Sequence, residues 1–316
     1  MSCEAVVCGE AMLLMLAERG VPLEHAVTFR RSVAGAESNV AAGLARLGHT
    51  VRWIGRVGDD PSGRAVLAQL RAQSVDTSYA VTDPSAPTGV LMRDSHPARA
   101  IDVLYLRTGS AASRLAPEEL RPGALDGARL VHVTGITPML STSAHRATLR
   151  LLDLAREAGA TVSFDPNVRR KLGEPARWRE TVAPLLNRAD VVLAGQDELE
   201  LLGVRDVTAL LADGPATVVV KHRDKSAAYL TREGGHLRQA PFEVPVTDPV
   251  GAGDAFAAGF LSGLLRDAPA EECLRDAAAV AALVVQCSAD TDGLPDRPGL
   301  DRALEALTGG AETVHR

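Results

Sequence analysis

Apolar and polar residues follow two different rhythms along the chain. Short runs rich in apolar and β-branched residues predict strands at Ala5–Cys8, Val51–Val57, Leu130–Thr134, Thr161–Phe164, Val191–Ala194 and Thr217–Lys221. Between them, apolar residues recur every three or four positions, which predicts helices at Ser38–Leu47, Pro61–Ser74 and Ser143–Ala158. Alternating strands and helices are typical of a mostly parallel central sheet flanked by helices on both faces. We therefore predict an α/β fold.

The alternation is interrupted in two regions and ends before the C-terminus. Gly251–Arg266, Ala270–Gln286 and Gly299–Leu307 all have helical spacing. Segments 12–31 and 88–107 contain only short alternating stretches, and we interpret them as strands that project from the main sheet as a small β lid. An irregular surface hairpin is the alternative. We predict one domain over residues 1–316 that carries this lid.

Composition narrows the class of protein. Of 316 residues, 46% are hydrophobic and 23% charged, which is typical of a globular protein, and 34 Lys+Arg against 40 Asp+Glu give a net charge of −6. An acidic chain is a poor nucleic-acid binder. The longest apolar run, Ala277–Val285, is too short to span a membrane, and no positive charge precedes the apolar patch at 11–17, as a signal peptide would require. Four cysteines without metal-site spacing suit a reducing compartment. We expect a cytoplasmic protein with no nucleic-acid and no membrane partner.

A glycine-rich turn stands where the first C-terminal helix is expected to begin. Residues 247–259 read TDPVGAGDAFAAG. The backbone N–H groups of Gly251, Ala252 and Gly253 can point at one spot beside the positive end of the helix dipole, which suits a phosphoryl group. Asp254 follows, and its carboxylate would accept the proton of an attacking hydroxyl. The alternative role for Asp254 is an N-terminal helix cap. The chain has no GxxxxGK[ST] loop, so a kinase here is not of the P-loop kind.

This turn resembles a known signature. DPVGAGDAFxxG at 248–259 is similar to the C-terminal motif of the ribokinase-like (PfkB) carbohydrate kinases. AGAESNVA at 34–41, LARLG at 44–48 and GRVGDDPSG at 55–63 resemble the N-terminal motif of that family, in the expected order. The resemblance implies a ribokinase-like fold and an enzyme that uses ATP and Mg²⁺ to phosphorylate a sugar hydroxyl.

Five shorter motifs resemble the 2-keto-3-deoxygluconate kinases within that family: GAESN at 35–39, YLRTGSAAS at 105–113, GITP at 135–138, DPNVR at 165–169 and ADTDG at 289–293. The likeness implies transfer of the ATP γ-phosphate to the terminal hydroxyl of 2-keto-3-deoxygluconate, giving 2-keto-3-deoxy-6-phosphogluconate. A kinase for another sugar (ketodeoxygalactonate, fructose or ribose) and a non-catalytic sugar-acid sensor remain open.

The same likeness implies a set of substrate-binding residues: Gly35, Asn39, Tyr105, Arg107, Asn167, Arg169 and Asp290. A sugar acid needs a cation for its carboxylate, and a guanidinium can hold one through two hydrogen bonds, which favours Arg107 and Arg169. Four of these roles have an alternative. Arg107 could be a solvated lid residue, Arg169 part of a surface cluster, Asn39 a helix cap and Asp290 the start of an Asx turn.

On the nucleotide side the chain departs from the family. Arg223 and Ser226 replace the glycines of Lys-x-Gly-x-x-Gly after Lys221, and Gly195 replaces the asparagine of Asn-x-x-Glu. The resemblance still implies nucleotide contacts from Gly195, Lys221, Arg223, Ser226, Gly251 and Gly253, with Glu198 acting on Mg²⁺ through water. These departures bear on nucleotide affinity rather than on the reaction. Unpaired edges of the lid strands predict a homo-oligomer, a dimer or larger.

Overall fold

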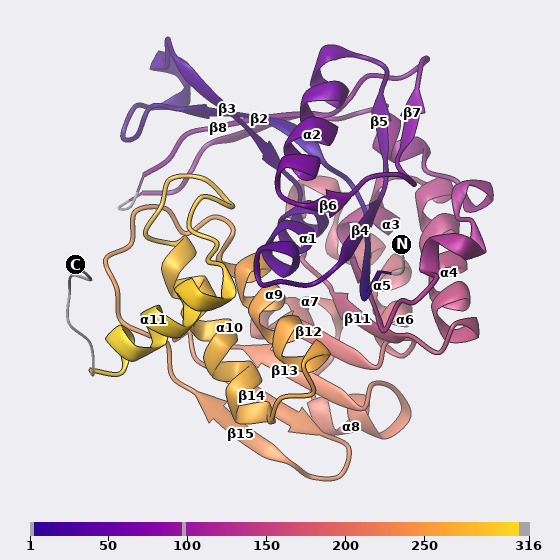
Figure 1. Cartoon of the computed structure of the whole chain (residues 1–316). Coiled ribbons are helices and arrows are strands. Elements are labelled where there is room, and N and C mark those ends of the chain that lie inside the picture. Colours follow the sequence, from indigo (N-terminus) through magenta and orange to yellow (C-terminus); the bar gives the residue numbers. More distant parts are fainter. Residues whose placement is uncertain (1–2, 97–98, 310–316) are drawn as a thin grey trace.

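The computed structural model describes residues 3–96 and 99–309, and its centre is a nine-stranded sheet (Figure 1). The strand order is β15-β14-β13-β12-β11-β10-β1-β4-β6, and only β14 runs antiparallel to its neighbours, β13 and β15. The strands are β1 (Ala5–Cys8), β4 (Val51–Ile54), β6 (Val75–Asp76), β10 (Leu130–Thr134), β11 (Thr161–Asp165), β12 (Val191–Gly195), β13 (Thr217–Lys221), β14 (Ala227–Thr231) and β15 (His236–Gln239). The predicted mostly parallel sheet is confirmed.

Helices cover both faces of this sheet, because its strands are apolar on both sides. Along β12, Val192 and Ala194 join one core while Val191 and Leu193 join the other. The first core is covered by α3 (Ile136–Leu140), α4 (Thr142–Glu157), α5 (Pro175–Thr181), α6 (Ala183–Leu186), α7 (Gln196–Leu202) and α8 (Val207–Asp213). The second is covered by α1 (Ala36–Arg46), α2 (Pro61–Ala72), α9 (Ala252–Leu265) and α10 (Ala270–Val284), with α11 (Arg297–Leu307) outside α10. Short 3₁₀ turns lie at Leu23–His25, Ala111–Arg114, Pro117–Glu119, Pro122–Leu125 and Arg170–Leu172.

Helix α9 packs closely against its neighbours at glycines. A Cβ at Gly43 of α1 would lie 2.5 Å from the Cβ of Ala258, and a Cβ at Gly259 would lie 2.7 Å from the Cα of Ala277 in α10. Both approaches are closer than a larger side chain allows. Small residues therefore set the position of α9 between α1 and α10.

A second sheet of four strands contains both segments for which we predict a lid. Its order is β3 (Phe29–Ala34), β2 (Met12–Ala17), β8 (Val90–Arg93) and β9 (Val103–Leu106), and β2, β3 and β8 extend away from the main sheet (Figure 1). We call it the lid sheet. These segments form regular strands rather than an irregular hairpin. Residues 1–2, 97–98 and 310–316 lie outside the described part, and the single domain over 1–316 stays a prediction.

Two differences from the sequence analysis concern strands. Val51–Val57 is not one strand: it divides into β4 and β5 (Arg56–Gly58), and β5 pairs with β7 (Val81–Asp83) in a separate sheet. The division falls at Gly55, where a Cβ would lie 2.5 Å from the carbonyl oxygen of Gly9. The antiparallel pair β14 and β15 was also missed, because the outer strand β15 is largely exposed and lacks the apolar run used to find strands.

The chain order places a crevice at the centre of the sheet. From β1 the chain moves outward to β4 and β6 and later returns to β10 on the other side of β1. Open parallel sheets bind ligands at such a switch point, beyond the carboxyl ends of the strands. Segments that follow β1, β10, β11, β12 and β13 meet there. Separately, no helix within residues 3–96 and 99–309 combines the length and apolar character needed to cross a membrane.

Candidate active site

A cavity of about 380 Å³ opens at this switch point between the main sheet and the lid sheet. We call it the first cavity. Its lining includes the seven substrate-binding residues predicted from the resemblance: Gly35, Asn39, Tyr105, Arg107, Asn167, Arg169 and Asp290. Asp254 and two glycines of the predicted phosphate turn, Gly251 and Gly253, line it as well. Residues far apart in the sequence therefore meet around one space.

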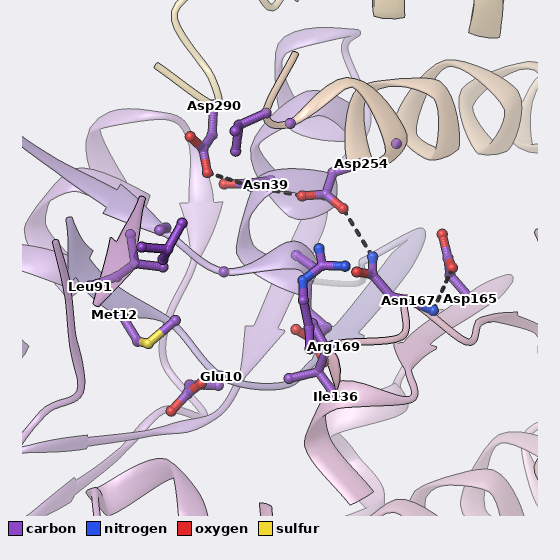
Figure 2. A pocket seen from close by; sticks show the side chains of 18 of the residues that line it. Glu10, Met12, Asn39, Leu91, Ile136, Asp165, Asn167, Arg169, Asp254 and Asp290 are labelled. Atoms are coloured by element: carbon purple, nitrogen blue, oxygen red, sulfur yellow. Dashed lines mark hydrogen bonds between the residues drawn. The ribbon is translucent and has the colours of Figure 1, made fainter. Parts of the chain in front are cut away.

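Asp254 is held by two amides inside this cavity. It lies in the first turn of α9 and is only 7% exposed. The Asn39 Nδ2 donates to its Oδ2 at 2.8 Å, and the Asn167 Nδ2 donates to its Oδ1 at 3.2 Å (Figure 2). The N-cap of α9 is Gly251, so the alternative role of Asp254 as a helix cap is wrong. Asn39 likewise lies inside α1, whose N-cap is Gly35, and is not a cap.

The electrostatic surroundings favour the protonated form of Asp254. The pKa of this carboxyl is raised to about 7, chiefly by burial and also by the neighbouring carboxylates Asp165 and Asp290, while Arg169 and the Asn39 amide oppose the increase. In Figure 2 the Arg169 guanidinium lies beside Asn167, on the same side of the cavity as Asp254. A carboxyl with such a pKa can both take up and release a proton near neutral pH.

The glycine turn before α9 has the backbone shape that the sequence suggests. Gly251 has φ +86°, and a Cβ there would lie 2.7 Å from the carbonyl oxygen of Asp290. A Cβ at Gly253 would meet nothing closer than the Nζ of Lys221 at 3.9 Å. The first N–H groups of a helix lack partners within the helix, so this turn presents donors to an open space.

The two arginines of the first cavity differ in their partners. Arg107, mostly buried, forms an ion pair with the buried carboxylate of Glu10, and its guanidinium lies 5.4 Å from the Tyr105 ring centre. Arg169 is half-buried and has no carboxylate partner among the ion pairs of the described residues. The alternative of a solvated lid residue is therefore wrong for Arg107. Arg169 lines the first cavity, while the next residues of its basic cluster, Arg170 and Lys171, are exposed. Arg169 is the less neutralised of the two cations.

Sequence reasoning missed Glu10 and Arg93. Glu10 lies two residues after the end of β1, and a carboxylate just beyond the carboxyl end of a buried strand was a usable signal. Arg93 shares the inner face of β8 with Leu91, because side chains alternate along a strand. It forms ion pairs with Asp248 and Asp290, so Asp290 is held by a guanidinium and the interpretation as an Asx turn is wrong.

A second cavity, of about 700 Å³, lies on the other side of the α9 N-terminus. Gly195, Lys221, Arg223, Ser226 and Gly253 line it, as predicted for the nucleotide, together with Ala252. Apolar side chains complete the wall: Phe242, Val244, Val246 and Phe256. Lys221 and Gly253 line both cavities, so the two spaces meet beside the glycine turn. Gly251 lines the first cavity only.

The polar side chains of the second cavity are partly engaged with the protein. Arg223 is exposed and pairs with Glu200 at 2.9 Å. The Ser226 hydroxyl donates to the carboxylate of Asp224 at 2.6 Å. Both must turn from these partners to contact a ligand, whereas the Lys221 ammonium, 2.8 Å from Asp165, already lies at the junction of the cavities.

Three carboxylates, Asp165, Glu198 and Asp254, act on the Lys221 ammonium at this junction. Glu198 accepts the N–H groups of Gly195 and Val168, each at 2.7 Å, and its pKa is raised by burial and by the nearby Asp165. Within the described residues, no three His, Cys, Asp or Glu side chains gather closely enough to hold a metal directly. This arrangement fits Mg²⁺ in one respect: the ion keeps most of its waters, and a fixed carboxylate can hold such a water.

The comparisons with known proteins agree with this site. Residues 4–297 match the family described as pfkB family carbohydrate kinase. The chain is 36% identical to the 2-dehydro-3-deoxygluconokinase of Bacillus subtilis (strain 168), over 100% of this chain and 98% of that protein. It is 35% identical to the 2-dehydro-3-deoxygalactonokinase of Haloferax volcanii, over 90% of this chain and 91% of that protein.

The solved structures show the same likeness. A PfkB protein from Polaromonas sp. JS666 is 38% identical, with a TM-score of 0.85, and the match covers 95% of this chain and 99% of that one. The predicted ribokinase-like fold is confirmed, as is the reaction class, an ATP- and Mg²⁺-dependent carbohydrate kinase. The chain belongs to the pfkB family of carbohydrate kinases.

Proposed function

We propose that the chain transfers the γ-phosphoryl group of ATP to the terminal hydroxyl of 2-keto-3-deoxygluconate. This compound is also called 2-dehydro-3-deoxygluconate, as in the name of the Bacillus subtilis kinase above. The product is 2-keto-3-deoxy-6-phosphogluconate. One observation carries this proposal: the first cavity presents Arg169, which has no carboxylate partner among the ion pairs of the described residues, beside the Glu10-paired Arg107 and a buried carboxylate, Asp254. Guanidinium groups bind a carboxylate, and a neutral sugar would not require them. The 36% identity to a kinase of that name adds support.

In this proposal Asp254 is the general base. Its carboxylate takes the proton of the terminal hydroxyl while the hydroxyl oxygen bonds to the γ-phosphorus. The bond from that phosphorus to the β–γ bridging oxygen breaks, and its electron pair leaves with ADP. Asn39 and Asn167 each donate to one oxygen of Asp254, which fixes the plane of the carboxylate. A base with a pKa near the working pH transfers protons efficiently.

We assign the stabilisation of the transferred group to the glycine turn and to Lys221. The N–H groups of Gly251, Ala252 and Gly253 would bind the phosphoryl oxygens as charge develops on them, and removing one such donor typically costs about 10²–10³ in rate. Lys221 and Gly253 line both cavities, so the γ-phosphoryl group would pass from nucleotide to sugar beside them.

Mg²⁺, when bound, neutralises phosphate charge, and we propose that Glu198 holds one of its waters. The nearby Asp165 pairs with the ammonium of Lys221 and so keeps that cation at the junction. The lid sheet would exclude water from the first cavity during transfer. Its strands contribute Met12, Leu91, Val103 and Tyr105 to the lining, which places them where closure would matter.

We also propose that the enzyme works in the cytoplasm and forms a dimer or a larger oligomer through the lid sheet. All four cysteines are free, which suits a reducing compartment. The strand β9 pairs with β8 on one side and ends the sheet on the other. Its Leu104 and Leu106 are 46% and 54% exposed, and an edge strand with exposed leucines favours pairing with a second copy.

The test is a coupled ADP-release assay with ATP and Mg²⁺ on a panel of 2-keto-3-deoxygluconate, its galacto epimer, fructose and ribose. We expect turnover of the sugar acids only, and loss of at least about a thousandfold in Asp254→Asn. Asp292→Asn is the matched control, because this exposed carboxylate pairs with Arg30 outside the first cavity, and it should retain activity.

The outcomes separate the alternatives. Preference for the galacto epimer would favour the second candidate, a ketodeoxygalactonate kinase, which the 35% identity to a protein of that activity supports. Turnover of fructose or ribose in place of the sugar acids would contradict the role of the two arginines. Binding of the sugar acid in calorimetry without any turnover would favour the sensor.

A further inference from the structure

A lid arginine is buried between two carboxylates of the body. Arg93, the last residue of β8, is 1% exposed. Its Nη1 donates to the Oδ2 of Asp248 at 2.6 Å, and its Nη2 donates to the Oδ1 of Asp290 at 2.7 Å. Nη1 also donates to the carbonyl of Asp94 at 3.1 Å, and Nη2 to that of Ser288 at 3.4 Å. One guanidinium thus joins the lid sheet to two separate loops.

From Asp290 the contacts continue to Asp254. The Oδ2 of Asp290 lies 3.5 Å from the Nδ2 of Asn39, the same nitrogen that donates to Asp254 at 2.8 Å (Figure 2). The Asn39 amide is therefore shared between two carboxylates, and its orientation depends on where Asp290 is held. Because Arg93 holds the other oxygen of Asp290, it controls that orientation from outside the contact with Asp254.

The other terminal nitrogen of Arg93, Nη1, contacts the segment that leads to the glycine turn. Asp248 opens the segment that leads to Gly251, and its Oδ1 accepts the N–H of Val250 at 3.0 Å. Its Oδ2 accepts from Arg93. A single side chain of the lid sheet is thus connected to both parts of the transfer machinery, the phosphate turn through Asp248 and the carboxylate of Asp254 through Asp290.

We infer that Arg93 is a positioning residue of the phosphoryl-transfer reaction, which fixes Asp290 and Asp248 so that Asn39 orients the Asp254 carboxylate and the lid sheet stays in register with it. The inference rests on the proposed function of Asp254 as the base. None of the hydrogen bonds of Arg93 described above goes to Asp254. It acts through Asp290 and Asn39.

The charges around Asp254 make this role measurable. Asp165 faces Asp254 from the end of β11, and Arg169 faces it from the segment after that strand. Lys221 faces it from the end of β13, and Asp290 from the loop before α11. Arg93 is the ion-pair partner of Asp290. Without Arg93 the negative charge of Asp290 is no longer offset, so the proton on Asp254 should be held to higher pH.

The experiment compares Arg93→Met with Arg30→Met in the full-length enzyme. Arg30 lies on β3 of the same lid sheet and pairs with Asp292 at 2.5 Å, in a loop that also contains Asp290, but its side chain is 50% exposed. Both changes therefore remove a lid-to-loop ion pair. We expect Arg93→Met to lower kcat at least about tenfold and to move the acidic limb of its pH profile upward by about one pH unit, and Arg30→Met to change neither.

Two further variants keep the inference falsifiable. Arg93→Lys retains one positive charge and should restore part of kcat. In Arg93→Met/Asp290→Asn, the negative charge of Asp290 is gone, while that of Asp248 stays unpaired. Because Asp290 is the carboxylate that acts on Asp254, the acidic limb should return toward its wild-type position. A purely structural role would reduce the fraction of active enzyme and leave that limb unmoved in every variant, and this result would overturn the inference.

If Arg93→Met has no activity, its pH profile cannot be measured. Hydrogen exchange measured by mass spectrometry then tests the inference, because it needs no substrate. Exchange in segments 88–96 and 248–254 should be faster in Arg93→Met than in wild type and unchanged in Arg30→Met. Equal exchange in Arg93→Met and wild type would overturn the inference. A wild-type enzyme that turns over nothing in the panel would instead contradict the proposed function.

Discussion

The proposed role of Asp254 as the base predicts the pH range in which the enzyme works. Burial raises the pKa of this carboxyl to about 7 from an ordinary value of 3.8. Below that pH the group is protonated and cannot accept a proton, so activity should rise as the pH increases through about 7. The measurement is kcat/KM for the sugar acid between about pH 5 and 9. A constant rate down to pH 5 would contradict the assignment of Asp254 as the base.

Glu10 and Arg107 form a buried pair whose partners depend on each other. Removing Arg107 leaves the Glu10 carboxylate buried without its counter-charge, which typically costs about 3–5 kcal/mol. We expect Arg107→Met to lower the free energy of unfolding in urea by about that amount, and Glu10→Gln/Arg107→Met to recover part of it. Arg223→Met is the control, because its pair with Glu200 is exposed and should cost about 1 kcal/mol or less. Equal losses in both single variants would contradict this account.

At the scale of elements, the start of α9 depends on two glycines in different ways. Gly251→Ala forces a side chain into positive φ and against the backbone of Asp290, so it should lower both kcat and the melting temperature. Gly253→Ala places its Cβ in open space between the two cavities. It should lower kcat with the melting temperature almost unchanged.

Scanning calorimetry together with the ADP-release assay tests this pair. A melting temperature reduced equally in both variants would show that the turn is equally strained at both glycines, contrary to the geometry.

Strands and helices were predictable where one pattern of apolar residues continues through the whole segment. The expected strands at Ala5–Cys8, Leu130–Thr134 and Thr217–Lys221 agree with β1, β10 and β13 residue for residue. The division of β4 from β5 at Gly55 was not predictable, because it depends on the carbonyl of Gly9, which is distant in the sequence. The strand β15 carries too few buried residues to produce an apolar run.

The members of the site were predictable where a motif contains them, and less so where distant contacts decide. Asp254 and the glycines stand in one recognisable run, and Asn39 and Asn167 belong to shorter ones. That Arg107 is paired with Glu10, and that Asp290 is held by Arg93, depends on side chains that no local pattern connects. The sequence therefore predicted which residues of a motif belong to the site. It did not predict which side chains from distant segments form ion pairs with them.

For the molecule as a whole, the proposed association of copies through the exposed edge of the lid sheet can be tested. If β9 pairs with a second copy, Leu104→Lys/Leu106→Lys should convert the dimer to a monomer, because charges on an edge strand oppose pairing. Val27→Lys is the control: Val27 is 93% exposed but precedes β3, away from β9 in the order of the sheet. Light scattering after size-exclusion chromatography gives the mass. A monomeric wild type would contradict pairing through this edge.

The close glycine contacts of α9 divide the molecule into parts that tolerate change unequally. Gly43 and Gly259 leave almost no room beside the helix that carries Asp254, so substitutions there disturb the transfer chemistry directly. Across the first cavity, Leu91, Val103 and Tyr105 belong to strands that do not support α9. A library of variants at these lid positions could therefore explore new acceptor sugars while the phosphate chemistry stays intact. The same asymmetry would let natural relatives diverge in acceptor choice while inheriting one unchanged catalytic helix.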